Sequence, residues 1–170
     1  MKKQVLVTVG TTKFEDLIIN LDNEKFYRML DEKGFDTVFY QIGSGEYSPT
    51  KWEKMNLINL KVNVVRLAPK FEEIIKDSEY IITHCGAGSL LESLKNKKKV
   101  IGVINEKLMD NHQMELASQL LKDEYIYLVT KMDNIITDLE TIMNSNKKLK
   151  EYSDFNYDII PNIIYEMLDI

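Results

Sequence analysis

The chain has 170 residues, of which 44% are hydrophobic and 29% are charged, and its formal net charge is −5 at pH 7. This composition is typical of one globular domain and excludes a disordered chain. The negative charge argues against a general nucleic-acid binder, and no apolar window approaches the roughly 20 residues of a membrane span. The single cysteine, Cys85, cannot form an internal disulfide, which fits a reducing compartment, so we expect a cytoplasmic protein.

Short apolar runs alternate along the chain with segments of helical periodicity. Runs with the composition of strands cover residues 4–9, 37–42, 59–67, 80–83, 99–104 and 126–129. Segments with helical apolar spacing cover residues 14–19, 24–33, 71–76, 90–94, 114–121 and 132–143. This alternation predicts an α/β fold with a mainly parallel sheet and helices on both faces. We expect residues 1–170 to form one domain, because no repeat or compositional break divides them.

A glycine-rich turn, residues 84–89, follows the fourth predicted strand and precedes a helix. The N-terminus of a helix offers unpaired N–H groups and a partial positive charge, and the glycines let a phosphate approach the backbone. Glu92 lies one helical turn beyond Gly88 and Ser89, where a carboxylate can accept hydrogen bonds from ribose hydroxyls. These features predict a nucleotide site. The alternative is a purely structural turn followed by an acid that stabilises the helix dipole.

The turn differs from two better-known phosphate motifs, because it lacks the Gly-Lys-Ser/Thr of a Walker loop and has Leu91 at the third glycine of the dinucleotide fingerprint. A second polar segment, residues 105–113, follows the next predicted strand. Open α/β sheets bind ligands at the carboxyl ends of their strands. We therefore expect this segment and the glycine turn to face one ligand.

Three sequence segments together resemble the Alg13 family. They are His-Cys-Gly-Ala-Gly-Ser-Leu-Leu-Glu-Ser-Leu at 84–94, Asn-Glu-Lys-Leu-Met-Asp-Asn-His-Gln-Met-Glu-Leu-Ala at 105–117, and Val-Thr-Val-Gly-Thr-Thr-Lys-Phe at 7–14. Members of this family are the donor-binding subunit of the UDP-N-acetylglucosamine (UDP-GlcNAc) transferase that adds the second sugar to dolichol-linked oligosaccharide. The resemblance covers about residues 4–130. It implies a Rossmann-like domain similar to the donor-binding C-terminal half of GT-B glycosyltransferases of family 28.

The resemblance also implies a donor site for UDP-GlcNAc. Residues 87–89 would contact the diphosphate, with residues 10–12 nearby, and Glu92 would hold the ribose. Residues 67–68 would border uracil, and residues 111–113 would face the sugar. The full set of matching positions is Gly10, Thr11, Thr12, Leu67, Ala68, Gly86, Ala87, Gly88, Ser89, Glu92, Asn111, His112 and Gln113.

The sequence does not identify a catalytic base. His84 and His112 are the candidates, although an isolated histidine at a strand end more often has a structural role. The chain contains no Asp-x-Asp pair of the kind that holds manganese in other glycosyltransferases. We therefore expect no metal, and the family resemblance implies an inverting transferase that uses no other cofactor.

A GT-B enzyme needs two Rossmann-like halves, and 170 residues suffice for one. The resemblance implies a partner, a membrane-anchored Alg14-like subunit that recruits the chain to the cytosolic face of the endoplasmic reticulum. Residues 159–170 form a candidate helix for that contact, and packing on their own domain is the alternative. Two other functions stay open: a subunit of a bacterial-type polysaccharide glycosyltransferase acting on a lipid-linked sugar, and a non-catalytic module that binds UDP-sugars.

Overall fold

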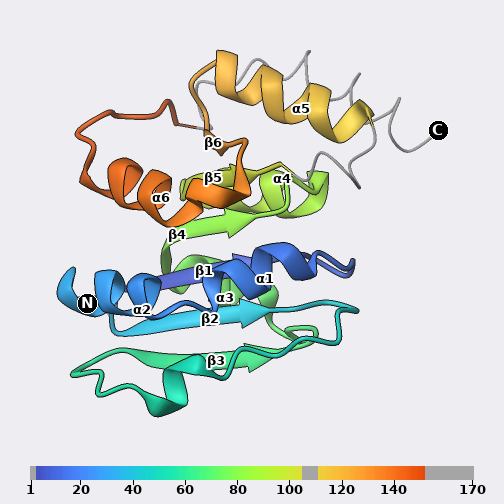
Figure 1. The fold of residues 1–170 in the computed structure, drawn as a ribbon. Helices are drawn as coiled ribbons and strands as arrows, with labels where there is room; N and C mark the ends of the chain where they lie inside the picture. Colours follow the sequence, from blue (N-terminus) through green and yellow to red (C-terminus); the bar gives the residue numbers. More distant parts are fainter. Residues whose placement is uncertain (1–2, 105–110, 152–170) are drawn as a thin grey trace.

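The computed structural model describes residues 3–104 and 111–151, which form one six-stranded sheet with flanking helices (Figure 1). The strands are β1 (Gln4–Thr8), β2 (Thr37–Gln41), β3 (Lys61–Val65), β4 (Ser78–Thr83), β5 (Lys99–Val103) and β6 (Tyr127–Val129). The α-helices are α1 (Glu15–Leu21), α2 (Glu24–Glu32), α3 (Phe71–Asp77), α4 (Ala87–Lys95), α5 (Asn111–Lys122) and α6 (Ile135–Asn144), and the short 3-10 helices are η1 (Lys51–Lys54) and η2 (Met132–Asn134). The candidate helix at residues 159–170 lies outside the described residues.

Every pair of neighbouring strands is parallel, and the strand order is β3-β2-β1-β4-β5-β6. This is the Rossmann arrangement, in which the chain builds outward from the centre of the sheet first in one direction and then in the other. The direction reverses between β1 and β4, whose residues Leu6 and Ile81 are direct partners. A crevice therefore forms where the loops after β1 and β4 diverge, at the carboxyl ends of these strands.

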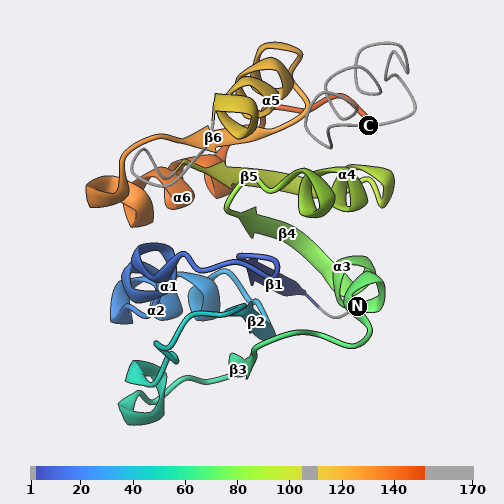
Figure 2. The ribbon, with the colours of Figure 1, turned by 90° about the vertical axis from the view of Figure 1, so that its right-hand side faces the viewer.

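Alternate residues of the central strands point to opposite faces and build separate cores. Val5 and Val7 pack in a large cluster with α1, α2 and α6, whereas Leu6 packs on the other face with Ile75 of α3. A third cluster holds α4 and α5 against β5, with Leu90 and Leu116 at its centre. Figure 2 shows α1, α2 and α6 on one side of the sheet and α3 and α4 on the other. The predicted α/β fold, with a parallel sheet and helices on both faces, is confirmed.

Several predicted boundaries differ in the structure, among them the starts of α4, α5 and β3. Helix α4 begins at Ala87 rather than at residue 90, so half of the glycine turn is already helical. Strand β3 begins at Lys61 rather than at residue 59, because the Asp31 carboxylate accepts hydrogen bonds from the N–H groups of Asn59 and Leu60 and holds them outside the sheet. Among the described residues, no helix has the length and apolar character needed to cross a membrane.

A buried carboxylate anchors the segment that follows β2. Asp22, at the end of α1, is fully buried and accepts hydrogen bonds from the hydroxyls of Tyr27 (2.7 Å) and Tyr47 (2.6 Å). It also accepts from the backbone N–H groups of Thr50 (3.0 Å) and Lys51 (3.1 Å) at the start of η1. The hydrogen bond to Asp22 raises the pKa of Tyr47 to about 12, so that hydroxyl keeps its proton at neutral pH.

Replacing this carboxylate by an amide tests the network. Each oxygen of Asp22 accepts from a backbone N–H, so an asparagine amide in either orientation places its NH₂ group against a backbone donor. We expect Asp22→Asn to lower the free energy of unfolding in urea by about 1.5–3 kcal/mol. Asp16→Asn, which changes an exposed carboxylate of the same helix, should shift it by less than about 0.5 kcal/mol. Equal effects of the two changes would contradict a role for the Asp22 network.

Candidate functional site

A cleft of ≈ 570 Å³ lies at the carboxyl ends of the central strands, where the direction of strand order reverses. It is lined by Gly10, Thr11, Thr12, Gln41, Leu67, Ala68, Phe71, His84, Gly86, Ala87, Gly88, Ser89, Glu92 and Gln113. All the positions that the family resemblance assigned to the donor are in this set except Asn111 and His112. These two begin α5, and their side chains lie outside the described part of the chain.

The first turn of α4 forms one wall of the cleft. Gly86 is the N-cap residue and provides no side chain to cap the helix, and a Cβ atom on Gly88 would meet nothing within 4 Å. Helices α1, α2, α3 and α6 each carry an acid in the first turn, whereas α4 and α5 carry none. No acid in the first turn of α4 itself offsets the partial positive charge at its start, and an anion can approach this turn from the cleft.

The loop after β1 lies directly against this helix start. Gly10 has a φ of +61°, and a Cβ atom on it would lie 3.8 Å from Ser89 Oγ. Thr11 and Thr12 are exposed at the cleft, but the Thr12 hydroxyl already donates to the Val9 carbonyl at 2.9 Å. This leaves the Thr12 oxygen as an acceptor only.

His84 lies beneath the glycines with only 8% of its surface exposed. Its backbone N–H donates to the Thr8 carbonyl at 3.3 Å, and Thr83 Oγ1 lies 3.4 Å from its Nδ1. A Cβ atom on Gly86 would lie 2.6 Å from His84 Cε1, so the ring fills the space that a larger residue at position 86 would need. Burial lowers the pKa of His84, so the imidazole is neutral at pH 7.

The other wall of the cleft comes from the loop after β3. Leu67 is 57% exposed, Ala68 is half-buried, and Phe71 begins α3 beside them. The Ala68 N–H donates to Oε1 of Gln41 at 2.9 Å. Our sequence analysis missed Gln41 and Phe71. The rule that ligands lie at the carboxyl ends of parallel strands would have singled out Gln41, the polar last residue of β2.

Glu92 and Gln113 complete the cleft from the two helices that flank it. Glu92 lies one helical turn after Gly88 on α4, and Gln113 lies in the first turn of α5; both are half-buried. Within residues 3–104 and 111–151, no group of three or more His, Cys, Asp or Glu side chains lies close enough to hold a metal ion. Independence from metal stays a prediction.

Cys85 has a packing role in the turn. It is fully buried with a φ of +65°, and its Sγ lies 2.6 Å from where a Cβ atom on Gly102 would be. Burial raises the pKa of the thiol to about 12, so Cys85 is protonated at neutral pH and is not a nucleophile.

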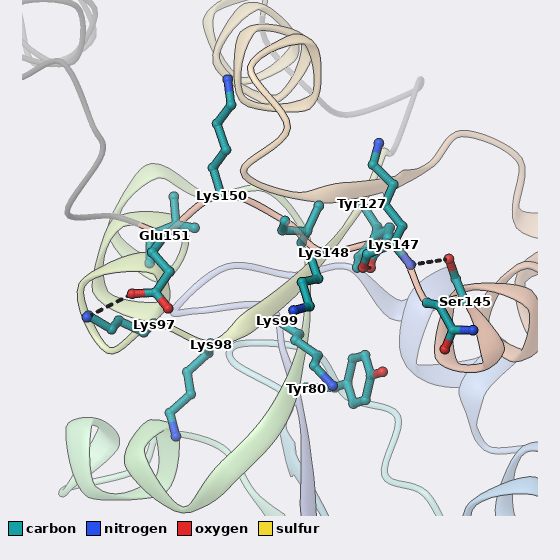
Figure 3. Close-up of a pocket in the computed structure, with 13 residues that line it drawn as sticks. Tyr80, Lys97, Lys98, Lys99, Tyr127, Ser145, Lys147, Lys148, Lys150 and Glu151 are labelled. Carbon is teal, nitrogen blue, oxygen red and sulfur yellow. Dashed lines mark hydrogen bonds and ion pairs between the residues drawn. The ribbon is translucent and has the colours of Figure 1, made fainter.

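A second cavity, of ≈ 470 Å³, lies near the other end of the strands and differs in character (Figure 3). Six lysines line it, and three of them are paired with carboxylates, at 2.9–3.3 Å: Lys97 with Glu151, Lys99 with Glu79 and Lys147 with Glu124. In Figure 3 the Lys98 and Lys150 side chains point in opposite directions, away from each other. Its positive charges do not converge on one point, so the cleft at the carboxyl ends is the better candidate for a small anionic ligand.

The contact of Gly86 with His84 predicts how two glycines of one turn differ. Gly86→Ala should lower the free energy of unfolding by about 1–3 kcal/mol, because the new methyl group overlaps the His84 ring. Gly88→Ala meets no neighbour and should leave stability unchanged or raise it by up to about 1 kcal/mol, because alanine favours the helix. Urea unfolding of both variants measures this difference, and a stable Gly86→Ala protein would show that the ring is not confined.

Comparison with known proteins identifies the family of this domain. Residues 4–163 match the glycosyltransferase family 28 C-terminal domain. The human UDP-N-acetylglucosamine transferase subunit ALG13 is 39% identical over 128 residues, which make up 75% of this chain but only 11% of the human protein. The chain thus spans about a tenth of that relative.

Two solved structures have a similar fold. A solution structure of ALG13 is similar with a TM-score of 0.65 at 25% identity, covering 98% of this chain and 94% of that one. MurG of Acinetobacter baumannii has a TM-score of 0.64 at 16% identity, covering 85% of this chain and 42% of MurG, which shows the fold alone. The fold is that of the C-terminal half of a GT-B glycosyltransferase. The chain therefore belongs to the glycosyltransferase family 28 C-terminal domains and, among these, to the Alg13 family that its sequence motifs indicated.

Proposed function

We propose that this chain is the donor-binding catalytic subunit of a two-chain UDP-GlcNAc transferase that adds the second GlcNAc to dolichol-diphosphate-GlcNAc in N-glycan precursor synthesis. One observation carries the proposal. Positions that match the family's donor-binding residues come from four separate parts of the sequence, residues 10–12, 67–68, 86–92 and 113, and they line one cleft. The curated relatives are named as subunits of a UDP-N-acetylglucosamine transferase, which supports the same donor.

The cleft offers a complementary group to each part of the donor. The diphosphate lies at the first turn of α4, where N–H groups and the helix dipole favour negative charge. The Glu92 carboxylate accepts hydrogen bonds from the ribose hydroxyls, and uracil lies against Leu67 and Ala68. Gln113 faces the sugar, and the family resemblance assigns Asn111 and His112 to the same part of the donor.

Transfer proceeds by direct displacement with inversion. An acceptor hydroxyl attacks the anomeric carbon, the bond to the diphosphate breaks, and the electron pair leaves with UDP. Negative charge develops on the leaving diphosphate. The start of α4 stabilises this charge, so that no divalent cation is needed. His84, neutral at pH 7, and His112 are the candidates for the base that takes the acceptor proton.

The acceptor side belongs to a partner. We propose a membrane-anchored Alg14-like subunit that brings the lipid-linked acceptor to the cleft and holds this chain at the cytosolic face of the endoplasmic reticulum. The word subunit in the names of the relatives supports a complex. Residues 159–170 are the proposed contact, and they lie outside the described residues.

Removing the Glu92 carboxylate tests the donor site. We expect Glu92→Ala to weaken UDP binding by about 1–3 kcal/mol, the range for a lost hydrogen bond to a charged group. Glu79→Ala is the matched control, because Glu79 is also half-buried but pairs with Lys99 at the amino ends of β4 and β5, at the other end of the strands from the cleft. It should leave UDP affinity unchanged. Isothermal titration calorimetry measures both. Unchanged affinity in Glu92→Ala would remove Glu92 from the ribose site.

Reconstitution tests the two-chain enzyme and its independence from metal. The purified chain should transfer no GlcNAc to a lipid-linked acceptor until membranes carrying the Alg14-like subunit are added, and the pair should keep its activity in EDTA. Transfer by the chain alone would refute the partner requirement. Loss of activity in EDTA with recovery in manganese would refute stabilisation by α4 alone. Full activity of the pair with Glu92→Ala would favour a non-catalytic accessory module.

A further inference from the structure

Gln41 occupies a central place in the floor of the cleft. It is the last residue of β2, the strand between β1 and β3, and its register partners are Thr8 on one side and Val65 on the other. Its side chain is only 4% exposed, yet it lines the cleft. A side chain at this position can reach the loops that follow both neighbouring strands.

Both the oxygen and the nitrogen of the Gln41 amide form hydrogen bonds to these loops. Oε1 accepts from the Ala68 N–H at 2.9 Å, in the loop after β3. Nε2 donates to the Gly10 carbonyl at 3.3 Å and to Thr8 Oγ1 at 3.2 Å, at the end of β1 and in the loop beyond it. The backbone N–H of Ala68 can only donate and the Gly10 carbonyl can only accept, so a flipped amide would oppose donor to donor and acceptor to acceptor. The orientation of the amide is therefore fixed.

One side chain thus bridges the two walls of the cleft directly. The loop after β3, residues 67–68, is the proposed wall for the base, and the loop after β1 with the start of α4 is the proposed wall for the phosphates. The Ala68 N–H and the Gly10 carbonyl are engaged within the protein, so their contribution is to hold the walls rather than to contact the ligand.

We propose that Gln41 is a positioning residue that holds the base-binding loop at a fixed distance from the phosphate-binding helix start. The inference rests on the proposed function and adds a selectivity to it. A ligand with a base and a diphosphate contacts both walls. Its affinity is higher when the spacing of the walls is already fixed, because no conformational entropy is then lost in ordering the loops on binding. A ligand with phosphates alone contacts one wall, so its affinity does not depend on the distance between the walls.

The test compares UDP with inorganic pyrophosphate by calorimetry on the wild-type chain and on Gln41→Leu. Leucine has a similar volume but breaks the bridge. We expect UDP affinity to fall about 10-fold or more, the effect of losing a well-made buried hydrogen bond. Pyrophosphate affinity should change less than about 2-fold, because only the helix start binds it.

Gln4→Leu is the matched control. Gln4 is also buried, at 8% exposed, and bridges in a similar way, to Ser78 Oγ at 2.8 Å and to the Ile74 carbonyl at 3.2 Å, but at the opposite end of β1. This variant should lose stability like Gln41→Leu and keep both affinities. The comparison separates a local effect on the cleft from a general loss of stability.

Gln41→Glu gives a second readout that does not depend on the leucine variant folding. Above the pKa of the new carboxyl, the carboxylate opposes the Gly10 carbonyl, and UDP binds weakly. Burial raises that pKa, and the protonated carboxyl can again donate to Gly10 and accept from Ala68. UDP affinity relative to wild type should therefore recover as the pH falls towards about 5, where such a carboxyl is protonated.

The outcomes distinguish the two proposals. If wild type binds UDP and Gln41→Leu binds it equally well, the positioning role is wrong while the proposed function stands. If Gln41→Leu loses UDP and pyrophosphate affinity to the same extent, Gln41 only supports the fold. If folded wild type binds pyrophosphate but not UDP at millimolar concentration, the proposed donor is wrong, and the positioning role is overturned with it.

Discussion

The pairing of β1 with β4 is the contact on which the candidate site depends. These strands are more than 70 residues apart in sequence, yet Val7 and Ile82 are direct partners at the centre of the sheet. Each strand continues into a loop that must turn away on opposite faces, towards α1 and α4 respectively. Gly10 and Gly86 lie at the two turns, and His84 fills the space between them. The cleft opens above this ring, at the carboxyl ends of the paired strands.

The loops on the other side of the cleft are tied to one another by the backbone. Gly43 donates its N–H to the Arg66 carbonyl at 2.9 Å, and Ser44 donates to the Thr12 carbonyl at 3.0 Å. A Cβ atom on Gly43 would overlap the Thr12 carbonyl, so only glycine allows this approach. Loops after three adjacent strands therefore form one layer, and the Gln41 amide lies within it. Such a layer holds its shape before any ligand arrives.

The sequence predicted those parts of the site that depend on local rules. A strand, a small-residue turn and a helix start at residues 80–95 are contiguous, so their chemistry could be inferred without knowing the rest of the fold. The bridging role of Gln41 could not be predicted, because it depends on which strands flank β2, and strand order is not a local property. Asp22 was missed for the same reason, since its partners Thr50 and Lys51 lie almost 30 residues away. The ligand-binding roles predicted for the site residues, Asn111 and His112 included, stay predictions.

The first turn of α4 carries no acid, and this affects the stability of the domain and its proposed binding of an anion in opposite directions. An aspartate near Gly88 would offset the helix dipole and stabilise the unliganded domain by about 0.3–1 kcal/mol. The same carboxylate would lie where the donor phosphates are proposed to bind and would repel them. Selection for thermal stability alone would favour such a substitution, whereas selection for an anionic substrate would remove it. The unliganded domain lacks the stabilisation that such an acid would give, and a diphosphate bound as proposed would supply the missing charge.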